Sequence, residues 1–294
     1  MLANGTKMKF GAHQTFALRE GWLHKGVRLL ESGQANFESD DAQNKLGVGR
    51  NMVKSIKFWM QLTGLIEKNT QTGNVELSPL AQLISQHDPY FIENETWWAL
   101  HVNMTTHKES PWCWFFENFR GDKFDRAQCI EQLNRFVRVG NKRPPQIKTI
   151  QREVACLLQT YGQSIPAERT DPEDGNDCPF IRLNLLQHFK ESGAFRFQKN
   201  TSFPTAKEIL CYALAKQFNN GFDIRLQEAV AATCSLFKID EDVLVITIEE
   251  AIAEFGSEKI NLINQAGERL ITMDFDLCWL KTFYLNSNRT RNAA

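Results

Sequence analysis

The segment at residues 39–60 constrains the fold more than any other. Gly47 and Gly49 separate a short apolar-faced stretch at 42–46 from a longer one at 50–60. In the longer stretch apolar residues recur at helical spacing, and polar residues occupy the opposite side. The apolar set is Met52, Val53, Ile56, Trp59 and Met60. Two helices joined by a glycine turn, the second with a polar outer face, are typical of a helix-turn-helix.

The flanking residues extend this pattern to a winged helix-turn-helix. A helix is expected over 21–30, before Gly33. Short strands at 65–68 and 75–77, around a polar turn at 71–74, predict the wing. Ser78-Pro79 then favours a new helix, because serine caps a first turn and proline fits it. We predict a winged helix-turn-helix DNA-binding domain over residues 1–87, although such modules also bind proteins.

The polar face of the predicted second helix of this motif is basic. Arg50 and Asn51 are expected to contact bases, while Lys54 and Lys57 are expected to meet phosphates. A proline-containing connector at 140–146 adds further cations, which either touch the phosphate backbone or face solvent. The complete set of expected DNA-binding residues is Arg50, Asn51, Lys54, Lys57, Lys25, Lys142 and Arg143.

The overall charge limits this interpretation. The chain has 294 residues, 34 basic and 35 acidic, with a formal net charge of −1. A protein that binds DNA alone often carries a basic excess, so a DNA surface here must be a local patch or be completed by a partner. No apolar run suits a membrane span, and no signal-peptide pattern opens the chain. We expect a cytoplasmic protein without a membrane partner.

The remaining residues predict a mainly α protein with small β elements. A mostly helical C-terminal domain is expected over 88–294. Helices are predicted at 125–138, 147–161, 223–237, 240–255 and 275–285, a helix opened by a Thr205–Glu208 capping box, a strand at 195–197, and a hairpin pairing 260–263 with 269–272. Residues 88–119 are dense in aromatics, for which core packing is favoured over stacking on bases.

Several kinds of site have no sequence support. The seven cysteines are too far apart for a zinc knuckle, and buried reduced thiols are expected instead. No Gly-Lys-Ser or Gly-Lys-Thr triplet occurs, so a phosphate-cradling nucleotide loop is not expected. We therefore expect neither zinc nor a nucleotide cofactor.

Residues 10–22, FGAHQTFALREGW, resemble the opening signature of the Ssp-type component B proteins, a bacterial family encoded beside DNA phosphorothioation genes. The matching positions are His13, Phe16, Leu18, Arg19, Trp22, Lys25 and Gly26. The similarity continues to about residue 285, through 46–53, Asp88-Pro89, Trp112 and Asp177-Cys178-Pro179. It departs mildly where Ala12 replaces a glycine and Arg50 a lysine.

The resemblance implies a role in replacing a non-bridging phosphate oxygen of DNA with sulfur, as part of antiviral defence. Members of the family are described as DNA nickases. They act with a cysteine desulfurase, an ATP-using sulfur-transfer enzyme and a further subunit. The implied partners of this chain are DNA and those proteins.

A nickase needs a base or nucleophile and a cation near the phosphate. His13 is the candidate base and Arg19 the candidate phosphate clamp, with Glu20 in the same block; structural roles are equally open for all three. Weak candidates for a Mg²⁺ or Mn²⁺ site are Asp171, Asp174 and Asp177, in what is otherwise an exposed acidic loop. The alternatives are a non-catalytic DNA reader that recruits sulfur-transfer partners, and a winged-helix transcription regulator.

Overall fold

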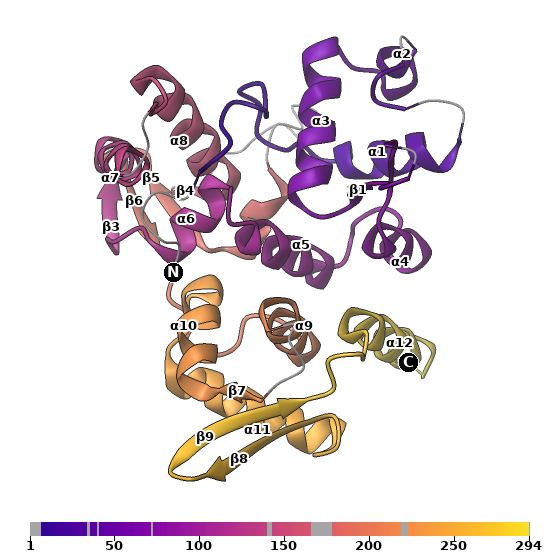
Figure 1. Ribbon diagram of the computed structural model, residues 1–294, viewed down its shortest axis with the longest axis vertical. Coiled ribbons are helices and arrows are strands. Elements are labelled where there is room, and N and C mark those ends of the chain that lie inside the picture. Colours follow the sequence, from indigo (N-terminus) through magenta and orange to yellow (C-terminus); the bar gives the residue numbers. More distant parts are fainter. Residues whose placement is uncertain are drawn as a thin grey trace. The chain divides into compact units, whose positions relative to one another are not determined.

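The computed structural model describes residues 7–33, 36–39, 41–71, 73–139, 143–165, 178–218 and 223–293. Helices dominate, accompanied by three small sheets, so the prediction of a mainly α fold with small β elements is confirmed (Figure 1). Backbone contacts divide the chain into two compact units, Leu2–Gln198 and Lys199–Ala294. The boundary expected at residue 87 lies inside the first unit, and a separate domain over 1–87 stays a prediction.

The first unit begins with six elements at the predicted places. They are α1 (Trp22–Glu31), α2 (Ala42–Leu46), α3 (Arg50–Leu62), β1 (Ile66–Lys68), β2 (Val75–Leu77) and α4 (Pro79–His87). The two strands pair antiparallel, with Ile66 opposite Leu77. Ser78 caps α4 by accepting the Ala81 N–H at 3.2 Å, as the Ser-Pro pair predicts.

Glycines allow α1, α2 and α3 to pack closely. A Cβ added to Gly26 of α1 would lie 2.1 Å from the Met60 sulfur of α3, so any larger residue there would force the Met60 side chain to shift. Gly47 ends α2 with a φ of 65°, a left-handed conformation that glycine adopts without strain. The apolar faces of α1 and α3 are then buried, as expected; the buried residues include Trp22, Leu23, Val27, Val53, Ile56, Trp59 and Met60.

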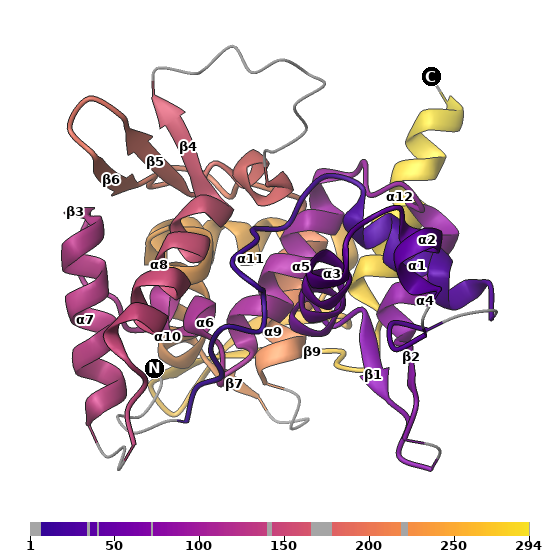
Figure 2. The same ribbon diagram turned by 90° about the horizontal axis from the view of Figure 1, so that it is seen from above.

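The rest of the first unit combines helices with a four-stranded sheet. The helices are α5 (Asn94–Thr106), α6 (Pro111–Glu117), α7 (Arg126–Arg138), α8 (Ile147–Tyr161) and the short 3-10 helix η2 (Pro179–Leu183). The strands are β3 (Lys123–Asp125), β4 (Gly162–Ile165), β5 (Leu186–Phe189) and β6 (Ala194–Phe197), in the order β3-β6-β5-β4. β4 follows directly on α8 and pairs parallel with β5 (Figure 2).

Aromatic residues form the core of this unit. Most aromatic side chains of residues 88–119 are buried; they are Phe91, Trp97, Trp98, Trp112, Trp114, Phe115, Phe116 and Phe119. Their rings meet mostly edge-on or tilted, as in the contact of Trp59 with Trp112 at 5.2 Å between centroids. Tyr90 is the exception, at 66% exposure. Core packing is therefore the correct interpretation of the buried set.

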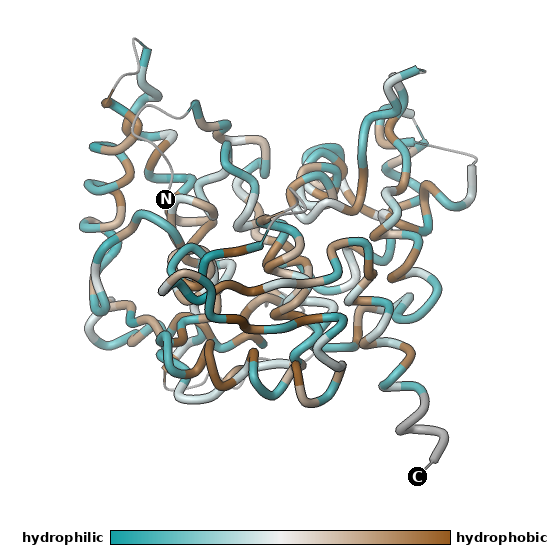
Figure 3. Tube along the Cα trace, turned by 60° about the horizontal axis from the view of Figure 1, so that its bottom comes forward, coloured by the Kyte–Doolittle hydropathy of each residue, from teal (hydrophilic) through white to brown (hydrophobic). Residues whose placement is uncertain are grey.

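The second unit contains the predicted hairpin. Its elements are α9 (Lys207–Gln217), β7 (Ile224–Arg225), α10 (Leu226–Phe237), α11 (Glu241–Phe255), β8 (Ile260–Gln265), β9 (Glu268–Met273) and α12 (Trp279–Ala293). The last helix starts four residues later than expected. The capping box is wrong: α9 follows Ala206 without a side-chain cap, and the Thr205 hydroxyl is buried without a partner. Figure 3 shows apolar and polar residues alternating along the helices of the chain.

All seven cysteines are free, and five of them are buried. Burial raises the pKa of Cys129 to about 12 and that of Cys234 to about 11, so these thiols resist ionisation. The expectation of buried reduced thiols holds for the five, while Cys278 is exposed. None of the helices in the described part of the chain combines the length and the apolar character that a bilayer crossing requires.

Candidate nucleic-acid interface

The exposed face of α3 carries the first three predicted DNA contacts. Arg50, Asn51 and Lys54 are all exposed, because the helix buries the side that bears Val53 and Ile56. Gly49 precedes the helix in an extended conformation and offers no side chain that would cover the first turn. Arg50 and Asn51 therefore project from the free N-terminal end of α3, where a basic and an amide side chain suit contact with base edges.

Two other predicted cations have partners within the protein. Lys57 is half-buried and forms an ion pair with Glu38, in the segment that leads to α2. Lys25 of α1 donates from Nζ to the backbone oxygen of Leu46 at 3.3 Å, at the C-terminal end of α2. Both lysines help hold the three helices together. Lys57 is thereby less available to a phosphate than Lys54.

The connector before α8 is only partly described. Arg143 is exposed, three residues before the Gln146 that precedes the helix, whereas Lys142 lies outside the described residues. The acidic residues of the weak metal site, Asp171, Asp174 and Asp177, also lie outside them. The described residues contain no cluster of three or more histidine, cysteine or carboxylate side chains with the geometry to hold a metal ion.

The two-stranded sheet is less suited to phosphate than α3. Glu67 lies opposite Glu76 in the register of β1 and β2, so two carboxylates occupy neighbouring positions. Asn69 donates from its amide to both carboxylate oxygens of Glu76, each at 2.9 Å. Lys68 supplies the cation of this pair of strands. The basic character of the segment therefore resides mainly on the helices.

His13 is held inside the protein on both sides of its ring. The backbone N–H of Thr15 donates to Nδ1 at 3.0 Å, so Nε2 carries the hydrogen that bonds to Glu153 Oε2, also at 3.0 Å. Both side chains are 1% exposed. Glu153 further accepts the backbone N–H of Gly11 at 2.9 Å. A ring with both nitrogens engaged and no access to solvent is poorly placed to take a proton from a water molecule beside DNA.

The other two catalytic candidates lie elsewhere along the same arm. The guanidinium of Arg19 lies 5.6 Å from the ring centres of both Phe16 and Trp22, a cation–π arrangement. Glu20 forms an exposed ion pair with Arg182 of η2 at 2.6 Å. His13, Arg19 and Glu20 therefore have three different sets of side-chain partners in the described part of the structure.

These contacts show what the N-terminal block does in the fold. The backbone oxygen of Phe16 accepts the indole N–H of Trp59 at 3.2 Å and the thiol of Cys156 at 3.4 Å. With the His13–Glu153 pair, the block thus joins α3 to α8. Glu153 was not predicted from the sequence, although a carboxylate on the apolar face of the 147–161 helix, beside Val154, is a signal that a buried partner exists.

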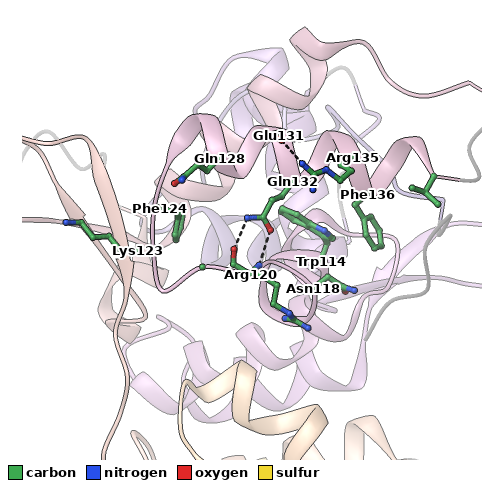
Figure 4. Close-up of a pocket in the computed structure, with 12 residues that line it drawn as sticks. Trp114, Asn118, Arg120, Lys123, Phe124, Gln128, Glu131, Gln132, Arg135 and Phe136 are labelled. Atoms are coloured by element: carbon green, nitrogen blue, oxygen red, sulfur yellow. Dashed lines mark hydrogen bonds and ion pairs between the residues drawn. The ribbon is translucent and has the colours of Figure 1, made fainter.

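One pocket of the first unit is lined by polar side chains that already bond to the protein itself. It measures about 610 Å³ and lies beside α7 (Figure 4). Gln132 bonds through its amide to the backbone N–H and carbonyl of Arg120, at 3.1 and 2.7 Å. Arg135 pairs with Glu131 at 2.6 Å. The aromatic side chains that line it, Trp114, Phe124 and Phe136, are at most 9% exposed, so they offer little free ring face for stacking.

Comparison with known proteins places the chain in a family. A model of a family described as "Protein of unknown function (DUF4007)" matches residues 10–287. The chain belongs to the DUF4007 family. The match begins with the N-terminal block of residues 10–22 and continues through both compact units. No curated protein matches this DUF4007 chain.

Two solved structures resemble this DUF4007 chain over almost its full length. A crystal structure of magnesium ion-bound SspB matches with a TM-score of 0.80 at 25% identity, covering 95% of this chain and 87% of that one. A second SspB crystal structure matches with a TM-score of 0.79 and the same identity and coverage. The chain therefore has an SspB-like fold, in agreement with the resemblance noted from the sequence.

Proposed function

We propose that this DUF4007 protein is the DNA-binding component of a bacterial DNA phosphorothioation system. Its first 87 residues would act as a winged helix-turn-helix, with α2 and α3 as the motif, β1 and β2 as the wing, and α3 as the recognition helix. The observation that carries the proposal is the exposed trio Arg50, Asn51 and Lys54 on α3. The SspB-like fold supports the assignment to the phosphorothioation system.

Within that system we favour a DNA reader that recruits the sulfur-transfer proteins. The contacts of His13 and Glu20 support this choice, because both side chains have partners inside the protein. The partners would be DNA, the ATP-using sulfur-transfer enzyme and the further subunit, with the cysteine desulfurase acting indirectly. A near-neutral chain that binds DNA only through a local patch would bind it more strongly when such partners add further contacts.

The nickase alternative then requires catalytic groups other than His13. A divalent cation, Mg²⁺ or Mn²⁺, would belong to that alternative, since it stabilises charge on a phosphate under attack. A supercoiled plasmid incubated with the purified protein, with and without each cation, distinguishes the two roles. Reader activity predicts a gel shift of intact plasmid, whereas open-circular product that depends on the cation would establish nicking.

Fluorescence anisotropy of a labelled DNA duplex tests the binding surface. The variant R50A/N51A/K54A should bind at least about tenfold more weakly, because loss of one good base contact alone costs about 1–3 kcal/mol. K57A should have a smaller effect, since Lys57 already pairs with Glu38. The control is R269A/K281A, which removes two exposed cations of the second unit. Equal binding by the α3 variant and the wild type would refute the assignment of α3 as the recognition helix.

A further inference from the structure

A groove with only basic charges lies between α1 and α2. Its volume is about 550 Å³, and it is lined by Lys25, Arg28 and Ser32 from α1, and by Asn44, Lys45 and Gly47 from α2 and the turn that follows. Lys25, Arg28 and Ser32 are spaced three and four residues apart, which places them along one side of the helix. The second wall is the C-terminal half of α2.

The charge of this groove differs from that of the chain as a whole. Its charged lining residues are Lys25, Arg28 and Lys45, and no carboxylate lines it, although the chain has 35 acidic and 34 basic residues. A concave surface lined by one sign of charge concentrates the electric field and attracts a ligand of the opposite sign. The groove therefore fits an anion.

The cations of the groove are held only loosely by the protein's own carboxylates. Arg28 contacts Glu31 at 3.2 Å and Lys45 contacts Asp41 at 3.6 Å. Both cations reach solvent, and exposed pairs of this kind are worth about 0–1 kcal/mol. An incoming phosphate can replace such partners at little cost.

The groove continues into the proposed recognition helix. Gly47 lines it, and the chain passes from there through Gly49 into the first turn of α3, where Arg50 and Asn51 are exposed. An extended polyanion lying in the groove would thus meet α3 next. A single small anion would not use this continuity, whereas a nucleic-acid strand would.

We propose that the α1–α2 groove binds the sugar-phosphate backbone of the same DNA that α3 contacts, with Lys25, Arg28 and Lys45 as phosphate ligands. The inference rests on the proposed DNA-binding function and adds a second contact surface to it. Phosphate contacts made by Lys25 and Lys45 would fix the orientation of α3 on the DNA, and Arg28 would extend the contact along the strand. Such contacts position the protein on the duplex without reading its sequence.

Salt dependence of binding tests the groove directly. R28Q/K45Q removes two cations while leaving Lys25, which bonds to Leu46, in place. Because each phosphate contact contributes about 0.9 to the slope of log affinity against log salt, the slope should fall by about 1.8. Between about 50 and about 200 mM salt the wild type should then lose roughly tenfold more affinity than the variant. R269A/K281A should keep the wild-type slope.

A second variant guards against misfolding of the first. E31Q/D41N keeps all the groove cations and removes the two carboxylates that contact them. It should bind the duplex more tightly than the wild type, because the cations are released for phosphate. A destabilised protein would not gain affinity, so tighter binding here supports the groove whatever the stability of R28Q/K45Q.

The outcomes separate this inference from the proposed function. If R50A/N51A/K54A loses binding while R28Q/K45Q keeps the wild-type slope and E31Q/D41N the wild-type affinity, the groove is not a DNA site but the proposed function stands. If the wild type does not bind DNA at all, both fail together. If R28Q/K45Q binds DNA normally but no longer binds an acidic peptide such as poly-glutamate, the groove serves an acidic protein segment and the inference is overturned.

Discussion

His13 behaves in the structure as a structural residue whose partner lies far along the chain. Its bond to Glu153 joins residues 140 positions apart, and both side chains are almost completely buried. Buried polar groups are costly when their partners are removed, because the remaining group loses both water and its hydrogen bond. The pair therefore stabilises the fold, because each side chain supplies a hydrogen bond that the other would otherwise lack.

His13→Ala should lower the free energy of unfolding by about 3 kcal/mol, because it leaves Glu153 buried with only the backbone N–H of Gly11 as a described partner. Urea unfolding followed by tryptophan fluorescence would measure this loss. H13A/E153L is the matched control, and it should be less destabilised than H13A since no carboxylate is left alone. A fully stable H13A that has lost a nicking activity would instead mark His13 as catalytic.

His188 predicts a dependence of stability on pH. Burial, with nearby Lys190, lowers the pKa of His188 below its ordinary 6.5, and its ring stacks on Phe195 at 4.3 Å. As pH falls below 6.5, the unfolded chain binds a proton at this residue before the folded chain does, so stability decreases until the folded pKa is reached. The melting temperatures of wild type and H188Q, compared from about pH 8 to about pH 5, should converge or cross in the acid range. A constant difference would contradict the assignment.

At the scale of elements, the close approach of α1 to α3 depends on one glycine. Gly26→Ala places a methyl group against Met60, which is fully buried, and should destabilise the protein by about 1–3 kcal/mol. Differential scanning calorimetry would detect the lower melting temperature. G26A/M60A is the control: if steric overlap is the cause, G26A should cost less in the M60A background than in the wild type.

The elements that the sequence predicted share a local signal. Helical periodicity located α1, α3, α7 and α8, and the turn at Ala266-Gly267 located the β8–β9 hairpin. Most of the four-stranded sheet was not predicted, because β4 and β5 are four residues each and pair in parallel across a long connection. Neither strand alternates clearly between apolar and polar residues, so only the 195–197 strand was expected.

The candidate site, too, was predictable from the sequence only in part. The exposure of Arg50, Asn51 and Lys54 follows from which side of a helix is apolar, and the periodicity of α3 was enough to predict it. The partners of Glu20 and Lys57 could not be predicted, since Arg182 lies 162 residues from the first and Glu38 lies 19 residues from the second. Ion pairs between exposed side chains leave no periodic trace in a sequence.

At the scale of the whole molecule, the two compact units suggest separable functions. The α1–α2 groove and the exposed face of α3 both belong to Leu2–Gln198, whereas the hairpin and α9–α12 belong to Lys199–Ala294. The second unit has its own buried residues, among them Leu210, Phe237, Ile248 and Trp279. Each unit thus has the apolar core that independent folding requires.

Expressed alone, residues 199–294 should give a cooperative thermal transition by circular dichroism, and residues 2–198 should bind a DNA duplex with close to the affinity of the full chain. Both follow if the DNA surface and its supporting core lie within the first unit. A second-unit fragment without a cooperative transition would show that its core is incomplete. Loss of DNA binding by the 2–198 fragment, if it is folded, would show that the second unit takes part in binding.

The separation of His13 and Glu153 along the sequence also has a consequence for synthesis on the ribosome. The arm around His13 emerges first, but its buried position is completed only when α8 has been made, 140 residues later. At about 5–20 residues per second, the nascent arm would wait for about 7–28 s with its aromatic side chains uncovered. During that interval the emerging chain is open to capture by chaperones or by its neighbours on a polysome, and slower elongation would lengthen the interval.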